Sequence, residues 1–369
     1  MSKATEVFVV GGGPAGLAAA IAMRQQGFRV TVADGAEPPI DKACGEGFLP
    51  DGVAELERLG IQIPSSEMRP FFGIRFLNES RSASAEFSGT RNGLAVRRTV
   101  LHRVMMERAK QLDVELLWRA PVNGISAEGV QVGGRLIRAR WIVGADGANS
   151  PVRRWAGLDH GPKPRMRFAF RQHVRVAPWS DHMEVYWGAR CQGYATAVSD
   201  DQVCLALASN NPQLRVEDGL AELPALKARI SGAEIVSRER GALTGNHKFT
   251  RVQSGKVALI GDASGTVDAI TGEGLGLAFR QAMALAETLK SGTLVPYERA
   301  HRRLGVRPRW MARLMLCMDR RPALQERTLS VLRKHPEIFR RLLELHIGER
   351  PALDAVKDGL MLGWRLLTA

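Results

Sequence analysis

Short apolar runs that end at glycine-rich turns recur along the chain and predict an α/β fold. The first run, 7–10, leads into the turn 11–16, and a stretch of small and apolar residues at 17–23 follows it. A second apolar run, 28–32, stops just before Asp34. Strands that alternate with helices in this way predict a parallel sheet covered by helices.

The central part of the chain has a different pattern, in which polar and apolar residues alternate along short runs. These runs lie at 168–176, 183–187, 194–198 and 203–208, with Gly, Asn, Asp or Ser between them. Alternation at every second residue is typical of strands with one buried face. We therefore predict an antiparallel sheet over 165–250.

The turn at 11–16 reads Gly-Gly-Gly-Pro-Ala-Gly and places a G-x-G-x-x-G spacing between the first strand and its helix. In that motif Gly11 permits the tight turn, Gly13 lets the backbone approach a pyrophosphate, and Gly16 lets helix and strand pack closely. The free N–H groups of the helix N-terminus favour the anion. The predicted pyrophosphate site therefore consists of Gly11, Gly13, Pro14, Ala15 and Gly16.

Three acidic residues that follow predicted strands complete the expected dinucleotide site. Asp34 lies eighteen residues after Gly16, where a carboxylate accepts from ribose hydroxyls and disfavours a 2′-phosphate. Asp146 lies in a Gly-Ala-Asp-Gly turn, and Asp262 lies in a Gly-Asp-Ala turn where it can accept from a sugar or ribityl hydroxyl. Taken singly, each of the two later turns is equally well explained as an ordinary strand-turn-helix corner.

A further glycine-rich turn, 271–276, opens a helix that runs to Leu289. The N–H groups of its first turn could face a flavin pyrimidine and stabilise negative charge on the reduced ring. The cofactor residues predicted in this part of the chain are Gly261, Asp262, Gly272, Gly274 and Leu275.

The order and spacing of these turns resemble the flavoprotein superfamily that contains p-hydroxybenzoate hydroxylase and the geranylgeranyl reductases. The resemblance covers about residues 5–290 and implies that FAD is the cofactor. It also implies that Arg98, which comes after the third strand, lies near the FAD. The alternative for Arg98 is a solvated arginine at the start of a helix.

The segment 42–47 reads Lys-Ala-Cys-Gly-Glu-Gly and is similar to the cysteine-glycine-glycine motif of the reductases, which lies against the isoalloxazine ring. The resemblance implies that Lys42 contacts the cofactor and that Cys44 takes part in catalysis, although Glu46 replaces a glycine. A reactive role for Cys44 requires a thiolate or a well-placed thiol. By its residue type alone, Cys44 is equally a small buried side chain in a glycine turn.

Two sets of features point to different reactions. The stretch 261–274 lacks the histidine and the proline pair of the aromatic hydroxylases, which favours the reductase branch. The commoner activity of the superfamily in bacteria and the modest length of the chain favour a monooxygenase. We predict a monooxygenase, driven by NADH or NADPH, that acts on an apolar or aromatic small molecule of polyketide, aromatic or isoprenoid type. The alternatives are a reductase of carbon–carbon double bonds, a flavin-dependent cyclase without net redox chemistry, and a flavin-binding protein without catalysis.

Three parts are expected from these patterns. Because FAD motifs stand on both sides of the predicted antiparallel sheet, that sheet is an insertion that can fold over the flavin. The parts are a Rossmann-like FAD-binding domain (1–164 and 251–296), a β-sheet substrate domain (165–250 with parts of 65–98) and a helical C-terminal segment (297–369). Tyr186, Trp187 and Tyr194 are the expected aromatic walls of the substrate pocket, or else plain core residues of the sheet.

The composition is typical of a cytoplasmic enzyme. A chain of 369 residues, 45% of them hydrophobic, can bury a large core. The four cysteines are widely spaced and have no histidines at ligand spacing, so we expect neither a disulfide framework nor a metal site. No apolar run reaches the length that spans a membrane. Because no second G-x-G-x-x-G follows, nicotinamide would bind transiently or a separate flavin reductase would supply the electrons.

The net charge of +14 is concentrated near the C-terminus. Residues 297–350 contain fourteen Lys or Arg and six Asp or Glu. Such a basic amphipathic segment can contact an anionic membrane surface or an acidic carrier protein, or it can attract an anionic substrate. The alternative is a solvated arginine face on helices that cover the FAD domain. We expect no nucleic acid partner, because no reading motif accompanies the charge.

Overall fold

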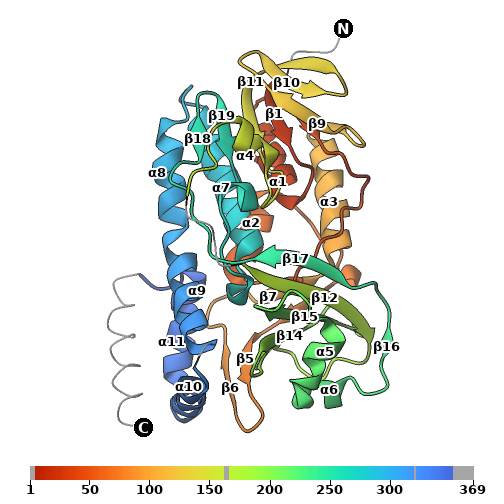
Figure 1. Ribbon diagram of the computed structural model, residues 1–369, viewed down its shortest axis with the longest axis vertical. Helices are drawn as coiled ribbons and strands as arrows, with labels where there is room; N and C mark the ends of the chain where they lie inside the picture. Colours follow the sequence, from red (N-terminus) through yellow and green to blue (C-terminus); the bar gives the residue numbers. More distant parts are fainter. Residues whose placement is uncertain (1–4, 162–165, 320, 352–369) are drawn as a thin grey trace.

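The computed structural model describes residues 5–161, 166–319 and 321–351, which form two large sheets, a small third sheet and a column of helices (Figure 1). The first sheet is built around β1 (Thr5–Val10). β1 pairs in parallel with β2 (Val30–Ala33) on one side and with β11 (Arg135–Gly144) on the other. β11 pairs in parallel with β19 (Val257–Leu259), so the carboxyl ends of β1, β11 and β19 lie at one edge of the sheet. The path continues outward to β18 (Gln253–Ser254) and β8 (Glu115–Leu117), and the hairpin β9 (Val122–Ile125) and β10 (Gly129–Val132) extends β11.

Helices cover this sheet because its strands are apolar on both faces. α1 (Pro14–Gln25) and α7 (Gly274–Leu289) pack on each other and bury mainly alanine and leucine. The small side chains of α1 let the two helices approach closely. The other helices of this part are α2 (Pro50–Arg58), α3 (Arg98–Gln111) and α4 (Pro151–Trp155).

The second sheet occupies the central part of the chain. Its strands are β12 (Arg167–Arg175), β13 (Met183–Trp187), β14 (Cys191–Ala197), β15 (Gln202–Ser209), β16 (Glu234–Ile235) and β17 (Arg240–Thr244), joined by β5 (Gly73–Leu77) and β6 (Ser82–Glu86). The pairing is antiparallel except at β5 and β13, which run parallel. The predicted antiparallel sheet thus has one parallel pairing, because the β5–β6 hairpin, from the predicted 65–98 part, adds to the edge of β13. A small sheet of β3 (Gly47–Phe48), β4 (Met68–Phe71) and β7 (Gly93–Val96) lies beside it.

Helices also flank the second sheet. The short helices α5 (Val216–Ala221) and α6 (Pro224–Arg229) pack on one face. The C-terminal helices form the column at the side of Figure 1. α10 (Pro322–Lys334) and α11 (Pro336–Ile347) pack against β6 of the second sheet, and α9 (Val306–Asp319) packs on them. α8 (Val295–Leu304) packs on α7, beside the first sheet. The predicted helical segment extends to 369, and its part beyond 351 lies outside the described residues. Over the described ranges, no helix combines the length and the apolar character needed to cross a bilayer.

A buried histidine on α8 makes the stability of this architecture depend on pH. His301 Nε2 accepts from the Gln281 amide (3.1 Å) and lies 2.9 Å from Ser264 Oγ, which joins α8 to α7 and to the Gly-Asp-Ala turn. Burial lowers the pKa of His301 from its ordinary 6.5 to about 4. Between these values the unfolded chain binds a proton that the folded chain does not bind, so protonation favours unfolding.

We predict that this contribution is complete above the unfolded pKa and is lost as the pH falls toward about 4, with a total on the order of 3 kcal/mol. Denaturant unfolding at a series of pH values should show a weaker acid destabilisation in His301→Gln than in the wild type. Parallel pH curves for the two proteins would contradict this prediction.

Candidate functional site

The glycine-rich turn after β1 has the backbone geometry of a pyrophosphate site. Gly11 has φ +107°, and a Cβ at this residue would lie 2.5 Å from Ala145 O. A Cβ on Gly16 would lie 1.8 Å from Gly11 O, so helix and strand pack closely only because Gly16 lacks one. A Cβ on Gly13, in contrast, would meet nothing within 4 Å. Gly13 therefore borders open space at the N-terminus of α1, where a phosphate is favoured.

Asp34 lies directly after β2 and closes this turn from the other side. Its Oδ2 accepts from Gly12 N–H (2.7 Å) and its Oδ1 accepts from Ala36 N–H (2.8 Å). The opposite side of the turn is held by His102, which lies 2.9 Å from the Gly12 carbonyl oxygen. Because a carbonyl only accepts, His102 donates through Nε2, and burial lowers its pKa and keeps the ring neutral. His102 was not among the predicted residues.

The second and third turns meet the first at the edge of the sheet. Asp146 Oδ2 accepts from Val152 N–H (3.0 Å), its Oδ1 is buried without a partner in the described chain, and burial raises its pKa. The buried Arg153 donates to Ala148 O (2.9 Å) and to Ala263 O (3.1 Å). This arginine, to which the sequence motifs assign no role, joins the second turn to the third.

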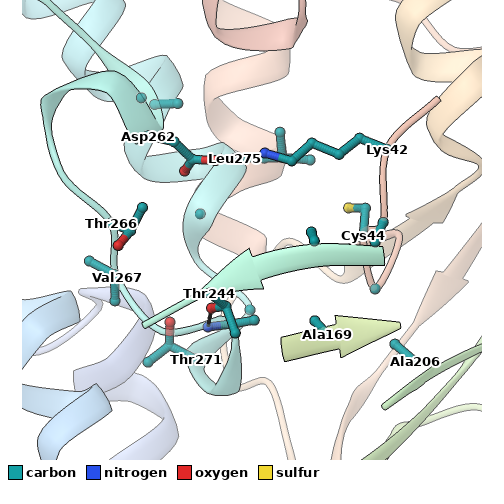
Figure 2. Close-up of a pocket in the computed structure, with 18 of the residues that line it drawn as sticks. Lys42, Cys44, Ala169, Ala206, Thr244, Asp262, Thr266, Val267, Thr271 and Leu275 are labelled. Atoms are coloured by element: carbon teal, nitrogen blue, oxygen red, sulfur yellow. Dashed lines mark hydrogen bonds and ion pairs between the residues drawn. The ribbon is translucent and has the colours of Figure 1, made fainter. Parts of the chain in front are cut away.

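Asp262 and Lys42 approach the same space from opposite sides. Figure 2 shows the two side chains pointing toward one another, and their Oδ2 and Nζ atoms are 2.9 Å apart. Each side chain keeps more than two fifths of its surface exposed, 43% for Asp262 and 42% for Lys42, so the pair is solvated rather than buried. Hydroxyl and phosphate groups could therefore replace these contacts at little cost.

The turn before α7 opens toward this space as well. Gly272 has φ +67°, and Gly274 is the first residue of α7. A Cβ on either glycine would meet nothing within 4 Å, so the backbone N–H groups of this helix N-terminus border open space. Leu275 lies beside them (Figure 2). A helix N-terminus in this position favours negative charge.

The loop at 42–47 is held by a buried network centred on Glu46, whose φ is +59°. Glu46 Oε1 accepts from Arg98 N–H (2.9 Å), and Oε2 lies 2.6 Å from His173 Nε2. On the other side of the ring, His173 Nδ1 lies 3.3 Å from Arg171 Nη1 and 2.8 Å from Ser237 Oγ. A guanidinium can only donate, so Nδ1 accepts and Nε2–H donates to Glu46.

This network joins the loop to α3 and to β12, and it holds a backbone conformation that glycine adopts more readily. Glu46 stands where the resembling motif has glycine. That departure was visible in the sequence, but its partners on β12 were not. Cys44 lies in the same loop, where its Sγ accepts from Glu46 N–H (3.4 Å). Arg98 borders the cavity described below.

Glu46, His173 and Cys204 also offer ligand atoms within 4.8 Å of one another. Two features oppose a cation at this point. Burial raises the pKa of the Cys204 thiol well above its usual value, which keeps it protonated and a poor ligand. The guanidinium of Arg171 approaches both the Glu46 carboxylate and the His173 ring, so the negative charge is already compensated.

A cavity of about 840 Å³ connects these turns with an apolar chamber. All of the predicted cofactor residues border it except Gly16, which lies behind Gly11. Beyond Cys44 the walls are the second sheet and the C-terminal helices, with side chains such as Met311, Leu314, Met315, Leu332 and Phe339. The polar turns and the apolar chamber are thus parts of one continuous space.

The three predicted aromatic residues are placed differently. Tyr194 borders the chamber. Tyr186 does not, because alternation along β13 turns it to the opposite face, where it packs under α5 and α6 and donates to Glu184. Trp187 is on the chamber side but lies behind Phe76, with ring centroids 4.8 Å apart. The expectation that Tyr186 and Trp187 line the pocket is therefore corrected.

The residues present fit FAD. The turn at Gly13 leaves room for a pyrophosphate, Asp34 lies at the carboxyl end of β2, and Asp262 borders the space between them and the chamber. Residues 4–293 match a family model described as an FAD binding domain. The chain belongs to this family of FAD-binding proteins. It is an FAD-dependent oxidoreductase, and the resemblance inferred from the sequence motifs is confirmed.

Curated relatives of the family include reductases and hydroxylases. The chain is 27% identical to a menaquinone reductase of Mycobacterium tuberculosis, over 80% of this chain and 78% of that protein. It is also 27% identical to the 3-demethoxyubiquinol 3-hydroxylase of Escherichia coli, over 78% of this chain and 80% of that protein. A geranylgeranyl diphosphate reductase of Synechocystis is likewise 27% identical, over 79% of this chain and 78% of that protein.

Solved structures show the same fold at lower identity. A flavoprotein/dehydrogenase from Cytophaga hutchinsonii superposes with a TM-score of 0.82 at 18% identity, covering 94% of this chain and 93% of that chain. A flavin-dependent brominase superposes with a TM-score of 0.79 at 17% identity, covering 94% of each chain. These likenesses establish the mixed α/β fold of the chain.

The open space at Gly13 gives a clean test of the cofactor site. We predict that Gly13→Val folds, because its Cβ meets no protein atom within 4 Å, and that it weakens FAD binding by roughly a hundredfold or more by occupying the pyrophosphate position. Gly124→Val, at another glycine with open space but on β9, is the matched control. Equal FAD dissociation constants for both variants, measured by flavin fluorescence, would exclude the assignment.

Proposed function

We propose that this protein is a monooxygenase that hydroxylates an aromatic or quinol-like ring carried on a long apolar chain, with electrons from NADH or NADPH. The observation that carries this proposal is the continuous cavity between the FAD-binding turns and the chamber under α9, α10 and α11. Its volume is in the upper range of small-molecule sites, so it can hold part of the cofactor and a substrate together.

The chemistry of the chamber walls supports an apolar substrate. Methionine and leucine side chains from α9 and α11 face Phe76, Val185 and Tyr194 of the second sheet. Methionine adapts its shape to irregular apolar ligands. Polar groups gather at the other end, near Arg98, Cys44 and the N-terminus of α7, where a ring with hydroxyl or carbonyl groups would be oriented. Thr328 of α10 and His346 of α11 are polar residues that also border the cavity.

When bound, FAD supplies the transfer of electrons from a nicotinamide to oxygen or to a double bond. The chain supplies binding, orientation and exclusion of water. Gly13, Asp34 and Asp262 would hold the dinucleotide, and the N-terminus of α7 would stabilise negative charge that develops beside it. The C-terminal helices close the chamber and keep water from the reacting atoms.

A second candidate is a reductase of carbon–carbon double bonds in an isoprenoid chain. It is supported by the position of Cys44 at the cavity wall, at the junction of the cofactor turns and the chamber (Figure 2). The names of the relatives divide between the two reactions, but the compounds named, menaquinone, demethoxyubiquinol and geranylgeranyl diphosphate, are all isoprenoid. Both candidates therefore take an apolar, chain-bearing substrate.

The cytoplasm remains the compartment we propose, in line with four cysteines that are all free.

Stopped-flow reoxidation of the reduced protein separates the two reactions. For a monooxygenase we expect rapid reoxidation by oxygen, a hydroxylated product when an alkylated resorcinol or quinol is present, and no reoxidation by an anaerobic alkene. Cys44→Ser should then leave the rate within about twofold of wild type, because the thiol is only a small side chain in its turn.

For a reductase, the alkene reoxidises the protein without oxygen, and Cys44→Ser slows that step while FAD stays bound. Retention of FAD in the variant is the control for folding. A wild type that is reoxidised by anaerobic alkene, and not productively by oxygen, would overturn the monooxygenase proposal.

A further inference from the structure

The outer face of α8 and α9 combines exposed apolar side chains with arginines. The two helices follow one another with only Gly305 between them and run along the same side of the molecule (Figure 1). Exposed residues recur along both helices every three or four positions, which places them on one continuous face. They are Val295, Arg299, Arg302, Val306, Trp310 and Arg313.

The apolar members of this face are unusually open to solvent. Val295 is 70% exposed, Val306 is 62% exposed and Trp310 is 39% exposed. A large apolar side chain in water costs free energy unless something covers it, and a row of them marks an interaction surface. Trp310 in particular belongs to the residue type that is enriched at the boundary between water and lipid.

The arginines around these side chains lack negative partners. From Arg299 to Met318 the chain contains no Asp or Glu. Within the described ranges, none of Arg299, Arg302 and Arg313 forms an ion pair. Arg307, in contrast, points inward and pairs with Asp51 (2.8 Å). The outer face therefore carries positive charge that the fold leaves uncompensated.

The inner face of α9 borders the chamber. Met311, Leu314, Met315 and Met318, spaced at helical intervals, line the cavity, while Val306, Trp310 and Arg313 lie on the outer side of the same helix. α9 is thus the wall between the substrate chamber and the exposed face. A partner that contacts the exposed face is therefore separated from the chamber only by the thickness of α9.

We propose that the α8–α9 face docks on an anionic lipid bilayer. Arginines at the level of the head groups meet the negative surface, while the valines and Trp310 enter the interface. No covalent step is involved, and the protein contacts the bilayer without crossing it. Docking would bring a substrate dissolved in the lipid close to the chamber. That consequence rests on the proposed function, whereas the docking itself does not.

An acidic protein partner would also meet the arginines. The bilayer is favoured because Val306 and Trp310 lie between the arginines instead of in a separate apolar patch, so charge and apolar contact are offered to the same flat surface. Lipid docking needs this mixture, whereas an acidic partner needs only the charge.

Vesicle flotation tests the proposal with the FAD-loaded protein, in the absence of NADPH and substrate. We expect binding to phosphatidylcholine vesicles that contain about a third phosphatidylglycerol, loss of binding in high salt, and little binding to pure phosphatidylcholine. Arg299→Glu/Arg302→Glu/Arg313→Glu should lower the partition coefficient about a hundredfold, and Trp310→Ser about tenfold.

The matched control reverses three exposed arginines on β11, Arg135, Arg138 and Arg140, and should bind like the wild type. FAD content reports on folding in every variant. Equal losses of vesicle binding in the α8–α9 variant and the β11 control would overturn the proposal, as would a wild type that does not bind anionic vesicles. Binding to a purified acidic carrier protein, and not to vesicles, would instead assign the face to a protein partner. Because no turnover is measured, these outcomes do not depend on which reaction the enzyme performs.

Discussion

Three backbone segments meet at Gly11 without room for a side chain, and the cofactor site depends on this contact. Gly11 N–H donates to Ala33 O, and Ala145 N–H donates to Val10 O, each at 2.8 Å. A Cβ on Gly11 would collide with Ala145, and a Cβ on Gly16 would collide with Gly11. The strand ends, the turn and the N-terminus of α1 are therefore locked together. The close contacts of Gly11 with Ala145 and of Gly16 with Gly11 fix the backbone that surrounds the open space proposed for a pyrophosphate.

A second constraint joins the chamber to the cofactor turns. Glu273, at the start of α7, is buried and lies 3.4 Å from both Arg307 of α9 and His346 of α11. Burial raises the pKa of Glu273, and the neighbouring guanidinium groups of Arg307 and Arg280 oppose that shift. His346 Nε2 in turn donates to Thr271 O (2.9 Å). The C-terminal helices that wall the chamber are thus attached to the turn before α7.

The outcome at β13 and at the 42–47 loop shows where sequence reasoning stops. The alternation of polar and apolar residues predicted the strand β13 correctly. Which face of β13 meets the chamber depends on how the sheet packs in the fold, and Tyr186 lies on the opposite face, under α5 and α6. Glu46 could be identified as a departure from a glycine motif, yet His173 lies 127 residues away and is brought to it only by the fold. Arg153 and His102 were overlooked for the same reason, since each acts through a backbone oxygen that no motif records.

The sequence by itself determined the turns that we propose as the cofactor site, because glycines at fixed spacing, a strand before them and an acid after the next strand are all local features with local physical causes. It also indicated the second sheet and the basic C-terminal helices. Only the tertiary structure decided what encloses the substrate. The chamber is formed by the sheet, by α9 to α11 and by the cofactor turns together, and its walls are apolar residues that any core would contain. Whether such residues face a cavity, a neighbouring side chain or the outside of α9 depends on long-range packing, which no local pattern encodes.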